Sequence, residues 1–138
     1  RIGLNSRLDT IQAAILIEKL KIYPQEIELR NKVADLYNKV LSGIVDTPLV
    51  DNDKKSVWAQ YTIQSDRRDE IQKLLVSNNI PSVIYYPKAL HQQSGYKSFP
   101  SVSSGLAISN ELPRRVLSLP MHPYVSKDLP ERIIEIIS

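Results

Sequence analysis

The sequence contains no cysteine, which excludes a disulfide framework and any thiolate metal site. Long hydrophobic runs are also missing. The longest apolar stretch, at residues 13–17, falls far short of the roughly 20 residues that a membrane-spanning helix needs, and the run at residues 133–137 is interrupted by Glu135. We therefore expect neither a secreted disulfide scaffold nor a membrane protein, and the missing cysteines agree with a reducing, cytoplasmic location.

A large excess of one charge is absent as well. The 18 Lys and Arg residues are spread among 15 Asp and Glu residues, which gives a net charge of +3. Because nucleic-acid binding requires a basic stripe, we expect no nucleic-acid partner. A metal site would require both histidines, His91 and His122, together with a carboxylate. Structural roles for them are favoured, so no metal is predicted.

Familiar catalytic motifs are missing too. The sequence has no Walker loop, GxGxxG, HExxH or GxSxG, so local spacing identifies no catalytic residue. With 138 residues, 42% hydrophobic and 24% charged, the chain has the composition of one globular domain. It opens on Arg1 and its single methionine is Met121, so we expect a piece of a longer protein.

Apolar periodicity predicts five helices. The first begins at Asn5 or Ser6 and ends near Tyr23, and its apolar residues spread beyond one stripe, which indicates cover on more than one side. A second helix starts at Pro24 and ends at Ser42-Gly43. The others are predicted from Asp66, as N-cap, to Asn78-Asn79, over residues 107–115, and from Ser126 or Asp128 to the end.

Three strands are expected at residues 57–64, 82–86 and 116–119. In the first, Tyr61 and Ile63 alternate with Trp58 and Thr62, which predicts one buried face with Trp58 on the opposite one. The pattern leaves the strand directions open. The fold class predicted is α/β, or α+β, in two layers: a small sheet of about three strands with helices on one face.

Polar and aromatic side chains stand at the ends of these elements. Asn5, Ser6 and Arg7 at a helix N-terminus suit an anion such as a phosphate, although from these residues alone an ordinary cap with a surface arginine is the favoured explanation. Tyr85 and Tyr86 end a strand just before His91. Alternation places one tyrosine toward the core and the other near the loop that carries His91, and packing alone would explain such a pair.

Four segments in order resemble the DegT/DnrJ/EryC1/StrS family of sugar aminotransferases. They are GLNSRLDTIQAA at residues 3–14, AQYTI at 59–63, YYP at 85–87 with LHQ at 90–92, and LSLPMHPY at 117–124. The resemblance implies the C-terminal domain of a fold-type I enzyme that depends on pyridoxal 5'-phosphate (PLP). Residues 1–23 would form an interdomain helix and residues 24–138 the small domain.

The resemblance also implies roles for individual residues. The lysine that forms the Schiff base lies upstream of Arg1, so this chain supplies no catalytic residue. Asn5 would contact the cofactor phosphate across a homodimer interface. Substrate contacts would come from Arg7, from Tyr86 as the tyrosine of the usual His-Tyr-Pro motif, from Tyr85 in place of its histidine, and from His91.

The implied substrates are glutamate and a nucleotide-linked keto sugar, with 3-keto sugars for surface polysaccharides favoured. Two alternatives stay open. One is a PLP-dependent deoxysugar dehydratase of the same family, and the other is a non-catalytic α/β regulatory or interaction domain. The chain alone is expected to be inactive, because the lysine is absent from it.

Overall fold

The computed structural model of the chain describes residues 7–138, so Asn5 and Ser6 lie outside the described residues. Its helices are α1 (Thr10–Leu41), α2 (Arg68–Ser77), α3 (Ala107–Arg115) and α4 (Leu129–Ile137), with a 3₁₀ helix, η1, at Leu90–Gln92. Its strands are β1 (Tyr61–Gln64) and β2 (Val116–Leu119). No helix within residues 7–138 is long and apolar enough to cross a membrane.

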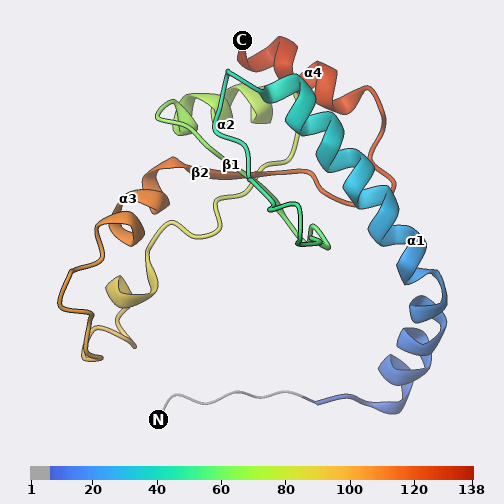
Figure 1. Ribbon diagram of the computed structural model, residues 1–138, viewed down its shortest axis with the longest axis horizontal. Coiled ribbons are helices and arrows are strands. Elements are labelled where there is room, and N and C mark those ends of the chain that lie inside the picture. The colour runs from blue at the N-terminus through green and yellow to red at the C-terminus, as the bar shows by residue number, and fades with distance from the viewer. Residues whose placement is uncertain (1–6) are drawn as a thin grey trace.

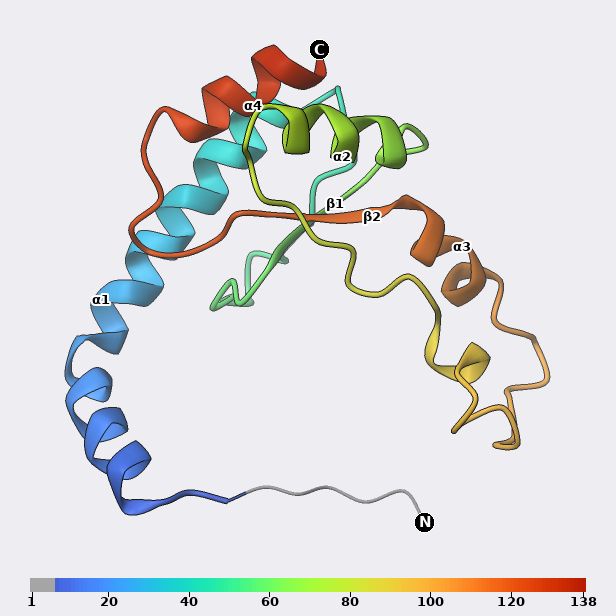
Figure 2. The same cartoon turned by 180° about the vertical axis from the view of Figure 1, so that it is seen from behind.

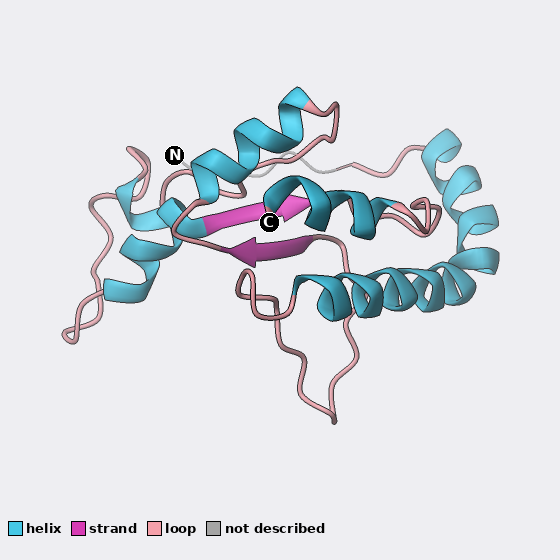
Figure 3. Ribbon diagram, turned by 90° about the horizontal axis from the view of Figure 1, so that it is seen from above, coloured by secondary structure: helices cyan, strands magenta, loops and turns pink. Residues whose placement is uncertain are grey.

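The two strands pair antiparallel, with Tyr61 opposite Leu119 and Ile63 opposite Leu117. These four side chains are buried, and α1, α2 and α4 cover that face of the pair (Figures 1 and 3). Burying a leucine or isoleucine contributes roughly 1.5–3 kcal/mol, so this layer holds the fold together. The predicted two-layer arrangement, with helices on one face, is confirmed.

The strand predicted at residues 82–86 is wrong as an extended element. Of residues 82–86, only Val83 pairs, exchanging two backbone hydrogen bonds of 3.1 and 2.8 Å with Ser118. Pro81 and Pro87 flank this bridge and cannot donate to a ladder, which keeps the pairing short. The bridge is antiparallel and lies on the side of β2 away from β1.

The first strand begins later than the predicted residue 57. Trp58 adopts a positive φ of 48°, which interrupts the extended backbone, and β1 starts at Tyr61. The alternation therefore fails at Trp58. Its side chain is buried instead of facing outward, and its ring packs 5.5 Å from that of Tyr61.

The two helices predicted to meet at Pro24 are a single helix. α1 begins after Asp9, whose carboxylate accepts a 2.8 Å hydrogen bond from the Gln12 amide, and continues through Pro24 to Leu41. A proline inside a helix removes one backbone hydrogen bond and bends the axis, and Figure 3 shows α1 bending. All its buried residues lie in the second half: Val33, Ala34, Tyr37 and Leu41.

The remaining helices follow the predictions more closely. α2 starts at Arg68 without a side-chain cap, because the Asp66 carboxylate lies 2.9 Å from the Arg115 guanidinium. It ends at Asn78 as predicted, and Asn79 takes a left-handed φ of 57°. α3 and α4 have the predicted positions and contain Pro113 and Pro130.

Candidate functional site

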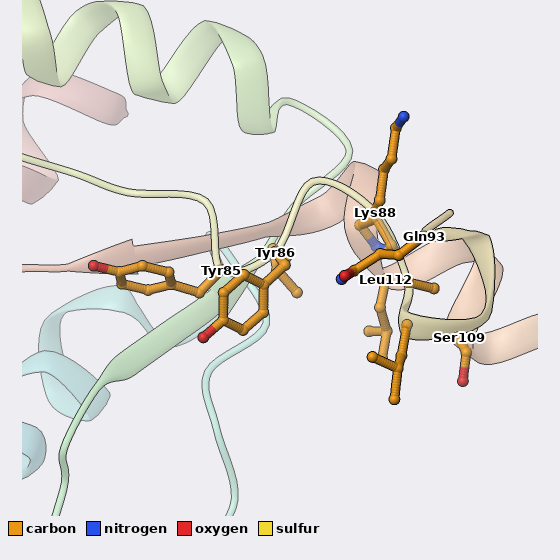
Figure 4. Close-up of a pocket in the computed structure, with 10 residues that line it drawn as sticks. Tyr85, Tyr86, Lys88, Gln93, Ser109 and Leu112 are labelled. Carbon is orange, nitrogen blue, oxygen red and sulfur yellow. The ribbon is translucent and has the colours of Figure 1, made fainter. Parts of the chain in front are cut away.

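A cavity of about 550 Å³ lies where the segment after Val83 passes α3. Tyr85, Tyr86 and Lys88 line it from that segment, and Ser109 and Leu112 line it from α3 (Figure 4). The structure thus brings both predicted tyrosines to one cavity.

Tyr85 and Tyr86 do not divide between the core and the surface as alternation predicts. Their side chains are 40% and 65% exposed, and their ring centroids lie 5.6 Å apart at 60°. The alternation rule applies only to extended strand backbone, and the pairing has already ended at Val83. Both rings are consequently available to a ligand.

Arg68 holds α3 against the sheet. Its Nη1 donates hydrogen bonds to the carbonyl oxygens of Pro113 and Val116, at 3.1 and 3.2 Å, and its side chain is almost fully buried. These two acceptors span the junction between α3 and β2. The α3 wall of the cavity is therefore fixed to α2.

Lys88 is the one charged side chain among the described residues that line this cavity. Figure 4 shows its ammonium group pointing away from the hydroxyl groups of Tyr85 and Tyr86. Gln93 and Ser109 supply the other polar side chains near the two tyrosines. Lys88, Gln93 and Ser109 were not predicted from the sequence, because no periodicity or motif marks the loop that carries Lys88 and Gln93 or the packing of α3 that brings Ser109 here.

His91 lies in η1 and lines a neighbouring cavity of about 560 Å³ together with Tyr96 and Phe99. The two cavities share Leu90 and Ser109 as lining residues. The Nε2 atoms of His91 and Gln92 each lie 2.8 Å from Asn110 Oδ1, so α3 fixes the imidazole. His91 is thus next to the tyrosine cavity without lining it.

The other predicted residues are not brought to this place. Arg7 precedes α1 and lines neither cavity, and the N-terminal end of α1 lies far from β2 in both side views (Figures 1 and 2). Asn5 lies outside the described residues. His122 accepts a hydrogen bond at Nδ1 from the Tyr124 amide, a local turn contact.

The side chains whose pKa is strongly shifted lie in the core and not at the cavity. Burial raises the pKa of Tyr37 and of Tyr61 far above its usual range, with Tyr61 adding to the shift at Tyr37. Within residues 7–138 no three acidic or histidine side chains gather to hold a metal ion. The candidate site offers hydroxyl, amide and aromatic groups, and these groups suit the binding and orienting of a polar ligand.

Taken together, fold and site define a small two-layer α/β unit with a tyrosine-lined cavity beside its sheet. The chain belongs to the DegT/DnrJ/EryC1/StrS aminotransferase family, whose sequence model matches residues 1–138.

Three similar proteins illustrate the match. An aminotransferase of this family from Brucella abortus, solved as a crystal structure, is 50% identical with a TM-score of 0.92, covering 99% of this chain and 37% of that one. The UDP-2-acetamido-2-deoxy-3-oxo-D-glucuronate aminotransferase of Pseudomonas aeruginosa is 41% identical over 91% of this chain and 34% of its own.

The dTDP-3-amino-3,6-dideoxy-alpha-D-galactopyranose transaminase of Aneurinibacillus thermoaerophilus is 33% identical over 99% of this chain and 37% of its own. The chain spans about a third of the length of the curated relatives it matches.

Proposed function

We propose that the full-length protein is a PLP-dependent aminotransferase that moves an amino group from glutamate to a nucleotide-linked keto sugar. The observation that carries this proposal is the family match over the whole chain, joined to two exposed tyrosines at a cavity. Relatives whose names specify UDP- and dTDP-linked sugars support a nucleotide sugar as substrate. The 3-oxo sugar of the P. aeruginosa enzyme favours a 3-keto acceptor.

In this proposal the chain binds and orients the sugar nucleotide. The hydroxyl groups of Tyr85 and Tyr86 would hydrogen-bond sugar or diphosphate oxygens, and their exposure supports this role. His91, in the adjacent cavity, would contact another part of the same ligand. Arg7 would reach the substrate only once the rest of the protein surrounds the start of α1.

The described residues do not fit PLP by themselves. The residue assigned to its phosphate, Asn5, lies outside them, and the one lysine at the tyrosine cavity, Lys88, points away from the hydroxyl groups (Figure 4). The cofactor's pocket is therefore proposed for the parent protein. PLP, when bound there, would supply the group that carries nitrogen between the two substrates.

The exposed first half of α1 supports the proposed boundary between an interdomain helix, residues 1–23, and the small domain, residues 24–138. Large apolar side chains are exposed on this half and at Leu8 just before it: Leu8, Ile11, Ile15, Leu16, Ile17, Leu20, Ile22 and Tyr23. A patch of this kind marks a contact surface. We assign it to the preceding part of the protein, in a cytoplasmic homodimer that serves polysaccharide biosynthesis.

A direct test gives the purified full-length protein a UDP-linked 3-keto sugar and glutamate. We expect 2-oxoglutarate and an amino sugar nucleotide in equal amounts, and no activity from residues 1–138 alone. Loss of a sugar hydroxyl without consumption of glutamate would instead identify a dehydratase. If neither reaction occurs with UDP- or dTDP-linked sugars, the proposal is wrong.

A further inference from the structure

A smaller cavity, of about 280 Å³, lies beside the candidate site and shares Tyr85 with it. One wall is formed by Ala59 and Gln60, which lead into β1. A second wall is formed by Pro120 and Met121, which follow β2. Two of the four segments that carry the family resemblance therefore face each other here.

No strand pairing holds these two walls together. The ladder between β1 and β2 ends at the pair Tyr61 and Leu119, next to the two walls, and Ser118 and Leu119 also line the cavity. Beyond that pair, a contact from α1 joins the two chain segments. Arg30, in the second half of α1, makes that contact.

The Nη1 atom of Arg30 donates to the carbonyl oxygen of Trp58 at 2.9 Å and to that of Met121 at 3.3 Å. One nitrogen with two hydrogens thus bridges a residue just before the first wall and a residue of the second. Arg30 itself lines neither cavity. Its effect on a ligand would pass through the walls.

Neighbouring side chains of α1 fix each wall to the same helix. Asn31 Oδ1 accepts from Trp58 Nε1 at 3.1 Å, while Asn31 Nδ2 donates to the Ser56 carbonyl at 3.2 Å. Tyr37 donates its hydroxyl to the Pro120 carbonyl at 2.9 Å. Arg30 is the residue of this set that contacts both chain segments, at Trp58 just before the first wall and at Met121 in the second.

We propose that Arg30 is a positioning residue for the sugar nucleotide: by bridging Trp58 and Met121 it sets the width of the cavity behind Tyr85 and so the place of that ring at the site. The proposal rests on the proposed function. A planar guanidinium holds two carbonyl oxygens in fixed directions, whereas the single ammonium point of a lysine does not reproduce that geometry.

The test uses the full-length protein with the substitutions Arg30→Gln and Arg30→Lys, and Lys39→Gln as the matched control on an exposed face of α1. Calorimetry measures the affinity for the UDP-linked amino sugar, and kinetics measures KM and kcat for the keto sugar. We expect both Arg30 variants to weaken affinity and raise KM about tenfold, with kcat changed less. Lys39→Gln should match the parent.

Each result tests either the positioning role of Arg30 or the proposed function. Folded Arg30 variants with the parent's affinity and KM would overturn the positioning role, even if their melting temperature falls. If Arg30→Gln does not fold, Arg30→Lys decides by the same criterion, because it keeps the charge and most of the packing. A parent protein that binds no sugar nucleotide removes the proposed function, and this role with it, before any variant is compared.

Discussion

At the scale of single residues, Tyr85 and Tyr86 differ from the aromatic residues of the core. Tyr37, Trp58 and Tyr61 are buried in the core, while Tyr85 and Tyr86 stay exposed beside a cavity. Their hydroxyl groups have no protein partner among the hydrogen bonds of the described residues. Water satisfies such exposed groups in the free protein, and a bound ligand can take its place.

Replacing Tyr86 by phenylalanine tests this difference. We expect kcat/KM for the nucleotide sugar to fall about tenfold in the full-length protein, the effect of losing a hydrogen bond worth about 1.4 kcal/mol. The matched control is Tyr124→Phe, since Tyr124 is equally exposed but bonds Glu26 outside the cavity. Equal kinetics for the two variants would remove Tyr86 from the site.

The buried tyrosines lead to a prediction about pH. Burial raises the pKa of Tyr37 and Tyr61 above the ordinary value of 10.0. Because the raised pKa belongs to the folded state, the stability from the neutral hydroxyl groups is complete below pH 10 and is lost as pH rises above it.

Urea unfolding of the chain between pH 8 and 11, followed by circular dichroism, measures this dependence. We expect the free energy of unfolding to fall with rising pH above about 10, and to fall less steeply in Tyr37→Phe. A slope that the substitution leaves unchanged would show that other groups control alkaline unfolding.

At the scale of elements, the sequence predicts those with regular backbone well. The ends of α2 at Asn78 and of β2 at Leu119 agree, and so do α3 and α4, because apolar periodicity and terminal residues act locally. Departures occur where a distant contact overrides the local pattern. Trp58 packs in the core, where Arg30 and Asn31 form hydrogen bonds with it. The Asp66 carboxylate pairs with Arg115 instead of capping α2 as predicted.

The candidate site was predictable only in part for the same reason. Tyr85 and Tyr86 stand at the end of a short β-rich run, and that signal identifies them. Ser109 and Gln93 reach the cavity through the packing of α3 and of the loop before it, which no pattern encodes. Arg30 contacts residues 28 and 91 positions away, so its role is visible only in the fold.

The first half of α1 carries its own prediction. If the preceding part of the protein covers it, Ile15→Asp places an unpaired carboxylate in an apolar contact and lowers the melting temperature of the full-length protein by several degrees. Leu49→Asp is the control, because Leu49 is 95% exposed on a loop. If scanning calorimetry shows that both variants keep the parent's melting temperature, no other part of the protein covers this face of α1.

At the scale of the whole molecule, the chain combines a compact core with surfaces that the core does not use. Helices α1, α2 and α4 cover one face of the β1–β2 pair (Figure 1). The tyrosine cavity and the exposed apolar half of α1 lie outside this core. Such a division suits a unit that completes an active site together with other polypeptide. In our proposal the binding residues lie here, and the chemistry of nitrogen transfer belongs to another part of the parent protein.

The most direct measurement follows the nitrogen atom itself. The full-length protein is incubated with ¹⁵N-glutamate and a UDP-linked 3-keto sugar, and the sugar nucleotide is analysed by mass spectrometry. The account predicts an amino sugar nucleotide that carries ¹⁵N, formed more slowly by Tyr86→Phe than by Tyr124→Phe. A sugar nucleotide without ¹⁵N, or equal rates for the two variants, would contradict it.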